Sequence, residues 1–289
     1  MKEEYLQGYF TWIEQRQAIY HKKQLGLPKP WTEDEIMQKY RFCNVFREQD
    51  KVTIWIDRFV RKRWKDHKYL WFALCVARRI NLPETLSDLD SLLVNWNWKK
   101  AEFILDNRKE AGKQIYSSAY MLTTGGRKFP KNYDTCYNIL ESLWLKRKEI
   151  TEQLENLTEE QQTLEHVFNM FAKGHVGYSG FIAYEIVTDM RHTRYLSRPS
   201  DRYTWANAGP GANRGLNRIH ERPLTAKIKA CQLNKEMQQL LYYSEFYLPE
   251  DFPRLEMRDV EHCLCEYDKY LRVSNDKGFL RQRYKGTGE

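Results

Sequence analysis

Arginine and asparagine side chains recur at helical spacing between residues 39 and 50. The polar residues at spacings of three and four positions are Arg41, Asn44, Arg47 and Glu48. A helix would carry them on one face, and an asparagine flanked by two arginines suits a phosphate group or the edge of a base. A solvated face with internal ion pairs is the alternative. The first interpretation predicts contacts with DNA on this face.

A glycine-rich turn joins two predicted helices between residues 168 and 191. The turn has the sequence Gly174-His175-Val176-Gly177-Tyr178-Ser179-Gly180. This is the layout of a helix–hairpin–helix motif, in which glycine lets the backbone approach a nucleic-acid strand and helix amides point at a phosphate. Ser179 stands where the usual motif has its second glycine, and a structural turn is the alternative. Gly177 and Gly180 are the predicted contacts with DNA.

A second glycine-rich loop precedes a cationic segment between residues 201 and 218. The sequence Gly209-Pro210-Gly211 is followed by Arg214 and Arg218. Such a loop can lead into a cationic helix start that suits an anionic leaving group, whereas a packed glycine turn is the alternative. The pattern is not a P-loop, since G-x-x-x-x-G-K-[ST] occurs nowhere in the sequence. These residues are therefore not expected to use ATP by that route.

Histidine, cysteine and acidic residues lie close together between residues 261 and 270. Cys263 and Cys265 form a C-x-C pair, which is a poor zinc signature without a second pair or a histidine cluster. The charged side chains of this segment form either a buried polar network or surface ion pairs. No metal ligands are predicted, and the scattered cysteines are expected to be reduced thiols in a cytosol.

Helices must position these segments, because helical periodicity dominates and period-two alternation is nearly absent. The predicted helices include residues 70–80, 98–111, 113–122, 134–155, 181–191, 225–242 and 255–273. Two more are expected at capping boxes, formed by Thr32 with Glu35 and by Thr158 with Gln161. The predicted fold class is therefore all-α.

The glycine loop at residues 123–130 is the clearest break in the middle of the chain. We expect a single helical enzyme domain over residues 1–289. Its possible lobes are residues 1–125 and 133–275, and residues 278–289 are expected to form a loose basic tail.

The composition is that of a globular protein with a basic surface. The chain has 289 residues, of which 42% are hydrophobic and 30% charged, so it is not a disordered chain. The net charge of +8 and the 14% aromatic content suit stacking on bases and binding of phosphates, although a mildly basic charge is common in soluble proteins. DNA is the expected partner. No apolar run could span a membrane, and the acidic start lacks the pattern of a signal peptide, which favours the cytoplasm.

Four groups of residues, in this order, resemble one family. They are Pro30-Trp31-Thr32 with Arg41-Phe42-Cys43-Asn44-Val45 and Arg47-Glu48; Gly180-Phe181-Ile182-Ala183-Tyr184-Glu185 with Asp189-Met190-Arg191; Trp205-Ala206-Asn207 with Gly209-Pro210-Gly211 and Arg214-Gly215-Leu216-Asn217-Arg218; and Glu261-His262 with Leu264-Cys265-Glu266 and Asp268-Lys269-Tyr270. They are similar to the α-glutamyl/putrescinyl thymine pyrophosphorylase family, also described as amino acid:DNA transferases. The similarity extends over nearly the whole chain.

The resemblance implies a step in the phage pathway of thymine hypermodification. A separate 5-hydroxymethyluracil DNA kinase acts first, and the transferase then displaces pyrophosphate with an amine, either an amino acid or a polyamine such as putrescine. Such an enzyme works in the cytoplasm of the host cell and needs no cofactor, although Mg²⁺ is compatible with the departure of pyrophosphate. Related helical segments are attached to the kinases, so a DNA-binding helical partner of the kinase is the alternative.

The implied reaction assigns roles to residues of these segments. The reacting methylene is hidden in the DNA duplex, so the base must be flipped or the strand opened, and the expected contacts to it are Trp31, Asn44, Tyr184 and Trp205. The groups expected to bind pyrophosphate are Arg41, Arg47, Arg214 and Arg218, with the loop glycines Gly209 and Gly211. A carboxylate must take a proton from the amine, and the candidates are Glu185, Asp189 and Asp201.

The glycine hairpin also resembles that of helix–hairpin–helix DNA glycosylases, which have a catalytic aspartate at a set distance beyond the hairpin alanine. Counted from Ala183, Asp201 falls close to that place and Asp189 well short of it. No lysine opens the second helix, where Phe181 stands, so a Schiff-base lyase is not expected. The resemblance implies a DNA glycosylase-like helical fold and leaves a glycosylase-like enzyme as a further alternative.

Overall fold

The computed structural model describes residues 1–118, 120, 128–175, 177–178, 180–275, 278, 280 and 283–284. Residues 123–127 of the expected glycine loop lie outside this part of the chain, and so does Ser179 of the expected hairpin. Most of the basic tail expected at residues 278–289 also lies outside it.

The described residues are helical and contain no β-strand, which confirms the predicted all-α class. Their one extended pairing is an isolated antiparallel bridge between Tyr40 and Arg283. None of the described helices has both the length and the apolar character that crossing a lipid bilayer requires. The helix–hairpin–helix motif and the glycosylase-like arrangement stay predictions.

The helices group into two compact units. Unit 1 consists of residues 1–50 and 202–289, and unit 2 consists of residues 51–201. Both ends of the chain therefore build unit 1. The lobes expected at residues 1–125 and 133–275 place the division elsewhere, because contacts between the two ends of a chain leave no signature in the local sequence. The assignment of the whole chain to one enzyme domain stays a prediction.

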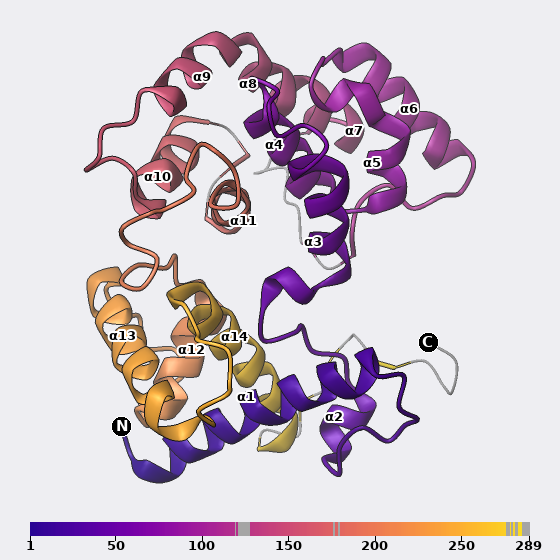
Figure 1. Ribbon diagram of the computed structural model, residues 1–289. Helices are drawn as coiled ribbons and strands as arrows, with labels where there is room; N and C mark the ends of the chain where they lie inside the picture. The colour runs from indigo at the N-terminus through magenta and orange to yellow at the C-terminus, as the bar shows by residue number, and fades with distance from the viewer. Residues whose placement is uncertain are drawn as a thin grey trace. The chain divides into compact units, whose positions relative to one another are not determined.

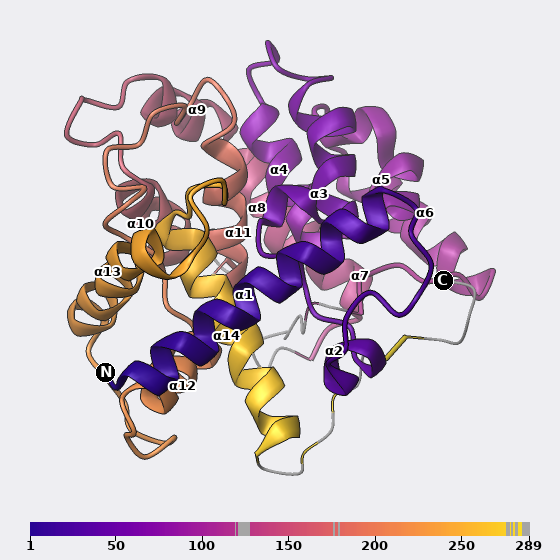
Figure 2. The same ribbon diagram turned by 60° about the horizontal axis from the view of Figure 1, so that its bottom comes forward.

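Unit 1 contains long helices from both ends of the chain. They are α1 (Glu3–Gln24), α2 (Glu35–Lys39), the 3₁₀ helix η1 (Arg47–Gln49), α12 (Pro210–Ile219), α13 (Ala230–Tyr247) and α14 (Met257–Ser274). Helices α12, α13 and α14 lie side by side in Figure 1, and Figure 2 shows α1 crossing α14. The buried ring of Tyr9 on α1 packs edge-on against Tyr267 on α14, with 5.5 Å between the ring centroids. Aromatic packing therefore joins the two ends of the chain.

Unit 2 contains shorter helices from the middle of the chain. They are α3 (Lys51–Ile56), the π-helix η2 (Asp57–Arg61), α4 (Leu70–Ile80), α5 (Pro83–Leu89), the 3₁₀ helix η3 (Asp90–Leu93), α6 (Trp98–Glu110), α7 (Lys131–Tyr133), the π-helix η4 (Asp134–Glu141), α8 (Ser142–Leu145), α9 (Arg147–Glu155), α10 (Leu164–Gly174) and α11 (Phe181–Met190). Helix α11 packs against α4 and α10 (Figure 1).

Helix α4 forms the centre of unit 2. All 11 of its residues are buried, including Arg78 and Arg79. A helix that is apolar on nearly every face is expected in the interior of a domain, which explains this position. Two arginines in such a helix need charged partners, because an unpaired buried charge is costly. Their partners identify the first candidate site.

Candidate functional site

A buried ion pair between Asp189 and Arg78 links α11 to α4. Arg78 donates from Nε to Asp189 Oδ2 over 2.6 Å and from Nη2 to Asp189 Oδ1 over 2.8 Å. The exposed fractions of the two side chains are 0% and 1%. Burial lowers the pKa of Arg78, but its interactions with Asp189, Tyr120 and Glu185 together raise it by more, so the guanidinium stays charged. The pair engages both oxygens of this predicted catalytic carboxylate.

Glu185 belongs to the same buried network. Its Oε2 accepts a hydrogen bond from Tyr120 Oη over 2.8 Å and lies 3.6 Å from Arg78 Nη1. Arg61 adds a second guanidinium, whose Nη1 lies 3.8 Å from Asp189 Oδ1. The structure therefore brings together two of the three predicted catalytic carboxylates, within a network of opposite charges. A catalytic role for either one stays a prediction.

Asp201, the third of these carboxylates, caps helix α10. Its Oδ1 and Oδ2 accept hydrogen bonds from the backbone N–H groups of Leu164 and Glu165, over 2.7 Å and 2.9 Å. The amides at the start of a helix have no partner within the helix, so this contact stabilises the end of α10. Asp201 is only partly buried, unlike Glu185 and Asp189. Its catalytic role stays a prediction.

Gly177 and Gly180 lie in the turn between α10 and α11 and have φ angles of 82° and 55°. These values lie in the left-handed region, which favours glycine. A Cβ atom at Gly177 would come within 2.7 Å of Ile139 Cδ1. The carbonyl oxygen of Gly177 accepts a hydrogen bond from Arg79 Nη1 over 3.3 Å. The turn therefore needs its glycines for structural reasons, and their contact with DNA stays a prediction.

Tyr184 and Trp205, two of the predicted base contacts, are buried. Their exposed fractions are 3% and 9%. The ring of Tyr184 packs edge-on against Phe168 of α10, with 6.5 Å between the centroids. Tyr184 belongs to unit 2 and Trp205 to unit 1. Both side chains contribute to the core of their own unit, and their contact with a base stays a prediction.

The helical face predicted at residues 39–50 is wrong. Helix α2 ends at the start of this segment, and only the short turn η1 forms within it. Asn44 instead closes a loop, in which its Nδ2 donates to the carbonyl oxygen of Gln49 over 2.9 Å and its backbone N–H donates to Asp50 Oδ1 over 3.2 Å. Arg47 Nη1 forms an ion pair with Asp50 Oδ2 at 2.9 Å. Asparagine and aspartate side chains bond the local backbone in loops, and this overrides the helical spacing.

Trp31 and Arg41 meet at the ring of Tyr284 in unit 1. The ring centroids of Trp31 and Tyr284 are 6.1 Å apart, and Arg41 Cζ lies 5.9 Å from the Tyr284 centroid. The Nζ atoms of Lys23 and Lys29 lie 4.8 Å and 5.2 Å from the same centroid. Cations are attracted to aromatic faces, and such a cluster suits a base or a phosphate group. The structure thus brings a predicted base contact, Trp31, together with a predicted phosphate-binding residue, Arg41.

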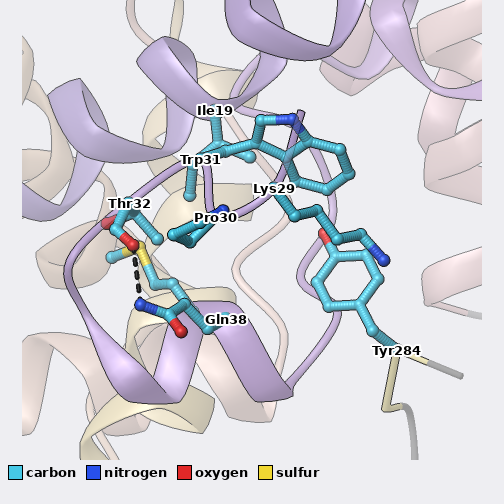
Figure 3. A pocket seen from close by; sticks show the side chains of 8 residues that line it. Ile19, Lys29, Pro30, Trp31, Thr32, Gln38 and Tyr284 are labelled. Carbon is cyan, nitrogen blue, oxygen red and sulfur yellow. Dashed lines mark hydrogen bonds between the residues drawn. The ribbon is translucent and has the colours of Figure 1, made fainter. Parts of the chain in front are cut away.

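A small pocket of about 100 Å³ opens beside these rings. Its lining residues are Ile19, Lys29, Pro30, Trp31, Thr32, Met37, Gln38 and Tyr284. Figure 3 shows the Lys29 side chain beside the rings of Trp31 and Tyr284. At the other side of the pocket, Gln38 Nε2 donates to the carbonyl oxygen of Thr32 over 2.8 Å. The predicted phosphate-binding arginines do not line this pocket.

Glycines allow α12 to pack closely against α14. A Cβ atom at Gly215 would come within 2.5 Å of a backbone carbonyl oxygen of α14, and one at Gly211 would overlap the side chain of Cys265. At the start of α12, the backbone N–H of Gly209 donates to Glu261 Oε1 over 3.1 Å. The structure therefore gives packing reasons for this glycine loop. Binding of pyrophosphate by Gly209 and Gly211 stays a prediction.

Replacing Gly215 with alanine is expected to lower the free energy of unfolding by about 2 kcal/mol. The new methyl group would press on the backbone of α14, and this outweighs the gain of about 1 kcal/mol in helix propensity. Urea unfolding followed by circular dichroism measures the change. Gly209→Ala is the control, because its Cβ would meet nothing closer than Glu261 Oε1 at 3.6 Å. Equal stability of the Gly215→Ala variant and the parent protein would contradict the close packing.

One buried aspartate of α14, Asp268, holds three arginines. Its carboxylate lies 2.9 Å from Arg214 Nε, 3.0 Å from Arg218 Nε and 3.8 Å from Arg272 Nε. Asp268 is 0% exposed, whereas Arg214 and Arg272 are 37% and 42% exposed. Three positive charges and one negative charge leave a net charge of +2. The structure therefore fixes a guanidinium cluster that faces solvent in part, as binding of a polyanion requires.

The sequence pointed to Arg214 and Arg218 as phosphate-binding residues, placed Asp268 in a polar network or in surface ion pairs, and gave no role to Arg272. The spacing of Asp268 and Arg272 by four residues on one helix is the only local signal for that pair. The contact of Asp268 with α12 depends on how two helices pack, which the sequence does not reveal. We name this group of four residues the Asp268 cluster.

The loop after α2 is fixed to a different flank of α14. There the backbone N–H of Cys43 donates to Glu266 Oε2 over 3.2 Å, and Lys269 Nζ forms an ion pair with Glu266 Oε1. Burial raises the pKa of Glu266, but the positive charge of Lys269, the neighbouring His262 and the hydrogen bonds to the carboxylate together lower it by more, so the carboxylate stays ionised. Of the two interpretations of residues 261–270, the buried polar network holds at this position.

The four predicted phosphate-binding arginines all belong to unit 1 but do not share one partner. Arg214 and Arg218 meet at Asp268, Arg47 pairs with Asp50, and Arg41 lies at the ring of Tyr284. The pair at Asp268 is therefore the best-defined part of the expected pyrophosphate site.

Comparison with known proteins identifies the family of the chain. A family model described as "5-hmdU DNA kinase, helical domain" matches residues 3–278. The chain is 25% identical, over 296 aligned residues, to a protein of Bacillus phage SP10 named 5-hmdU DNA kinase. The alignment covers 94% of this chain and 46% of that protein, so the chain spans less than half the length of this relative. No solved structure matches the chain significantly. Because the family model matches well over half of the sequence, the chain belongs to the family of 5-hmdU DNA kinase helical domains.

Proposed function

We propose that the chain takes part in thymine hypermodification of phage DNA, as a transferase that displaces pyrophosphate from 5-(pyrophosphoryloxymethyl)uracil with an amine. The observation that carries the proposal is the Asp268 cluster, in a chain of a family named for 5-hmdU DNA. The family description names a helical domain, and residues 1–289 contain no P-loop, which favours a role other than ATP-dependent phosphoryl transfer for this helical part.

In the proposed reaction, one bond forms and one bond breaks at the same carbon atom. The neutral amine attacks the exocyclic methylene carbon, a C–N bond forms, the C–O bond to the pyrophosphoryl group breaks, and pyrophosphate leaves with the electron pair. The attached nitrogen then loses one proton to a base. No oxidant or reductant is consumed, and the main demand on the protein is to stabilise the charge of the leaving group.

The Asp268 cluster meets this demand in two ways. Asp268 accepts hydrogen bonds from the Nε atoms of Arg214 and Arg218, so these two guanidinium groups are held in place before a ligand arrives. Fixed charges cost no reorganisation when the leaving group departs, which makes them more effective than mobile side chains. The aromatic and cationic group around Trp31 and Tyr284 offers stacking surfaces and positive charge for the DNA strand.

The proton acceptor of the proposed reaction stays a prediction among Glu185, Asp189 and Asp201. The bidentate contact of Asp189 with Arg78 favours a structural role for that residue. Asp201 is the most exposed of the three, and both of its carboxylate oxygens accept hydrogen bonds at the start of α10.

A nucleoside assay tests the proposal. DNA that contains 5-hydroxymethyluracil is first pyrophosphorylated by a kinase, then incubated with the protein and either glutamate or putrescine, and finally digested for mass spectrometry. We expect a new nucleoside whose mass equals that of hydroxymethyldeoxyuridine plus the amine minus water. DNA that was not treated with the kinase is the control and should stay unchanged. Absence of the adduct with a panel of amino acids and polyamines would overturn the proposal.

The same assay separates the alternative functions. Release of a free base would identify a glycosylase-like enzyme. Salt-dependent binding of DNA without any new nucleoside would favour a DNA-binding helical partner of the kinase. The name of the family and the match to 46% of a kinase motivate this second candidate. Repeating the assay with EDTA or with added Mg²⁺ shows whether the divalent ion assists.

A further inference from the structure

Three side chains of unit 1 with metal-binding atoms converge on the flank of α14 that faces the loop after α2. The Sγ atom of Cys43, a ring nitrogen of His262 and a carboxylate oxygen of Glu266 all lie within 4.8 Å of one another. His262 and Glu266 are one helical turn apart, so both project from the same side of α14. Cys43 reaches them from the loop. Thiolate, imidazole and carboxylate are the ligands that proteins use for zinc.

The loop that carries Cys43 is held rigidly against α14. The backbone N–H of Cys43 donates to Glu266 Oε2 over 3.2 Å. On the other side, the buried Arg16 of α1 donates from Nη2 to the carbonyl oxygens of Phe42 and Cys43, over 3.0 Å and 3.2 Å. Asn44 closes the loop at its next residue. Hydrogen bonds of this kind orient the ligands of metal sites, because they fix the ligand backbone before the ion binds.

We propose that Cys43, His262 and Glu266 bind one Zn²⁺ ion, with a fourth coordination position left for an exchangeable ligand. Zinc prefers four ligands in a tetrahedral arrangement, and sites with three protein ligands keep the fourth position open to water or to a substrate oxygen. Ligand atoms of a tetrahedral zinc ion with bond lengths of about 2.0–2.3 Å lie roughly 3.5 Å apart, so small side-chain movements are sufficient.

The neighbouring charges are compatible with a divalent cation. Arg47 and Lys269 lie at the edge of the site: Arg47 forms an ion pair with Asp50, whereas Lys269 pairs with Glu266, which is itself one of the proposed ligands. Binding of Zn²⁺ to a thiolate releases the thiol proton to solvent, so the site gains only one net positive charge. Once Glu266 binds the metal, the charge of Lys269 is only partly compensated and favours an anion, such as an oxygen of a phosphate group, at the fourth position. Zinc binding itself does not depend on the proposed transferase activity.

The sequence did not predict this site. The C-x-C pair of Cys263 and Cys265 supplies no ligand, and the cysteine in the ligand set comes instead from a segment more than two hundred positions away. A histidine and a glutamate four positions apart on a helix are common in solvated faces. Only the packing of the loop on α14 brings the third ligand to them.

Metal analysis of the full chain tests the proposal. The protein is incubated with zinc under reducing conditions, dialysed against buffer without chelator, and analysed by elemental mass spectrometry. We expect about one equivalent of zinc per chain, and a loss of most of it in Cys43→Ser. Cys231→Ser is the matched control, because Cys231 is an exposed thiol of the same unit. Less than a tenth of an equivalent in the parent protein, or equal zinc content in Cys43→Ser, would overturn the site.

Cobalt spectroscopy gives a second readout that does not depend on stability. Co²⁺ at this site should show a thiolate charge-transfer band in the near ultraviolet. The band should vanish in Cys43→Ser and change in position or intensity in His262→Gln, while circular dichroism shows that both variants are folded. A band that persists in folded Cys43→Ser would show that another cysteine binds the metal and would contradict the assignment. The two metal measurements test only the zinc site, and the nucleoside assay tests only the transferase activity. A negative result in one therefore leaves the other proposal unaffected.

Discussion

Replacing Asp189 with asparagine is expected to lower the free energy of unfolding by about 3–5 kcal/mol. The substitution leaves the guanidinium of Arg78 buried without its counter-charge, and the amide can accept only one of the two hydrogen bonds of 2.6 Å and 2.8 Å. Glu185, whose carboxylate lies 3.6 Å from Arg78, offsets part of this loss. Urea unfolding monitored by circular dichroism measures the change.

A matched control shows whether the loss of stability comes from the burial of the ion pair or only from the loss of one negative charge. Glu155→Gln in the same unit breaks the pair between Glu155 and Arg194, which are 48% and 36% exposed, and should cost less than about 1 kcal/mol. Replacing both partners of the buried pair, as Arg78→Met with Asp189→Leu, should recover much of the loss, because no unpaired charge remains. An Asp189→Asn variant with parent-like stability but without transferase turnover would instead assign Asp189 to catalysis.

The helical class and the strongest helices could be predicted from the sequence. The apolar run at residues 70–80 coincides with α4, and the expected helix at residues 98–111 coincides with α6. These segments combine long periodic patterns with good helix formers, so local and tertiary preferences agree. The helix expected at residues 113–122 is wrong over its described part, residues 113–118 and 120. Gly112, with φ 66°, ends α6 in the left-handed conformation that commonly stops a helix.

Capping was predicted in the right places but with the wrong residues. Helix α2 begins at Glu35, yet its cap is Asp34, which accepts from a backbone N–H over 2.8 Å, and not Thr32. The predicted box of Thr158 and Gln161 forms its backbone contact over 3.1 Å, but in a turn before α10. Several polar residues compete at each helix start, and the chain geometry that decides between them is not visible in a pattern.

The residue types of the candidate site could be predicted, but the partners of those residues could not. Arginines at residues 214 and 218 are visible as a cationic pair, whereas the carboxylate that holds them comes from another helix. Likewise, the division of the chain into units depends on packing between its two ends. Contacts between residues fifty or more positions apart in the sequence are decided by tertiary packing. These contacts determine which polar residues lie together in a site.

Replacing Arg214 with glutamine is expected to reduce the turnover number of the proposed transferase by about 100-fold, with a much smaller change in KM for DNA. The guanidinium would stabilise the charge that develops on pyrophosphate as the C–O bond breaks, and this charge is larger in the transition state than in the bound substrate. Arg214 is the best member of the Asp268 cluster for the test, because it is 37% exposed whereas Arg218 is 9% exposed. Initial rates at several DNA concentrations separate the two kinetic constants.

Arg254→Gln is the matched control for this experiment. It removes the same charge from unit 1, but Arg254 is 68% exposed and its carboxylate partner is Glu245, at 3.9 Å, rather than Asp268. If the protein only needed net positive charge to attract DNA, both variants would raise KM equally and the effect would fade at high salt. A position-specific loss of turnover in Arg214→Gln, partly restored in Arg214→Lys, would instead place the leaving group at the cluster. Equal effects of Arg214→Gln and Arg254→Gln would contradict that assignment, because a preorganised anion site depends on where the charge is fixed.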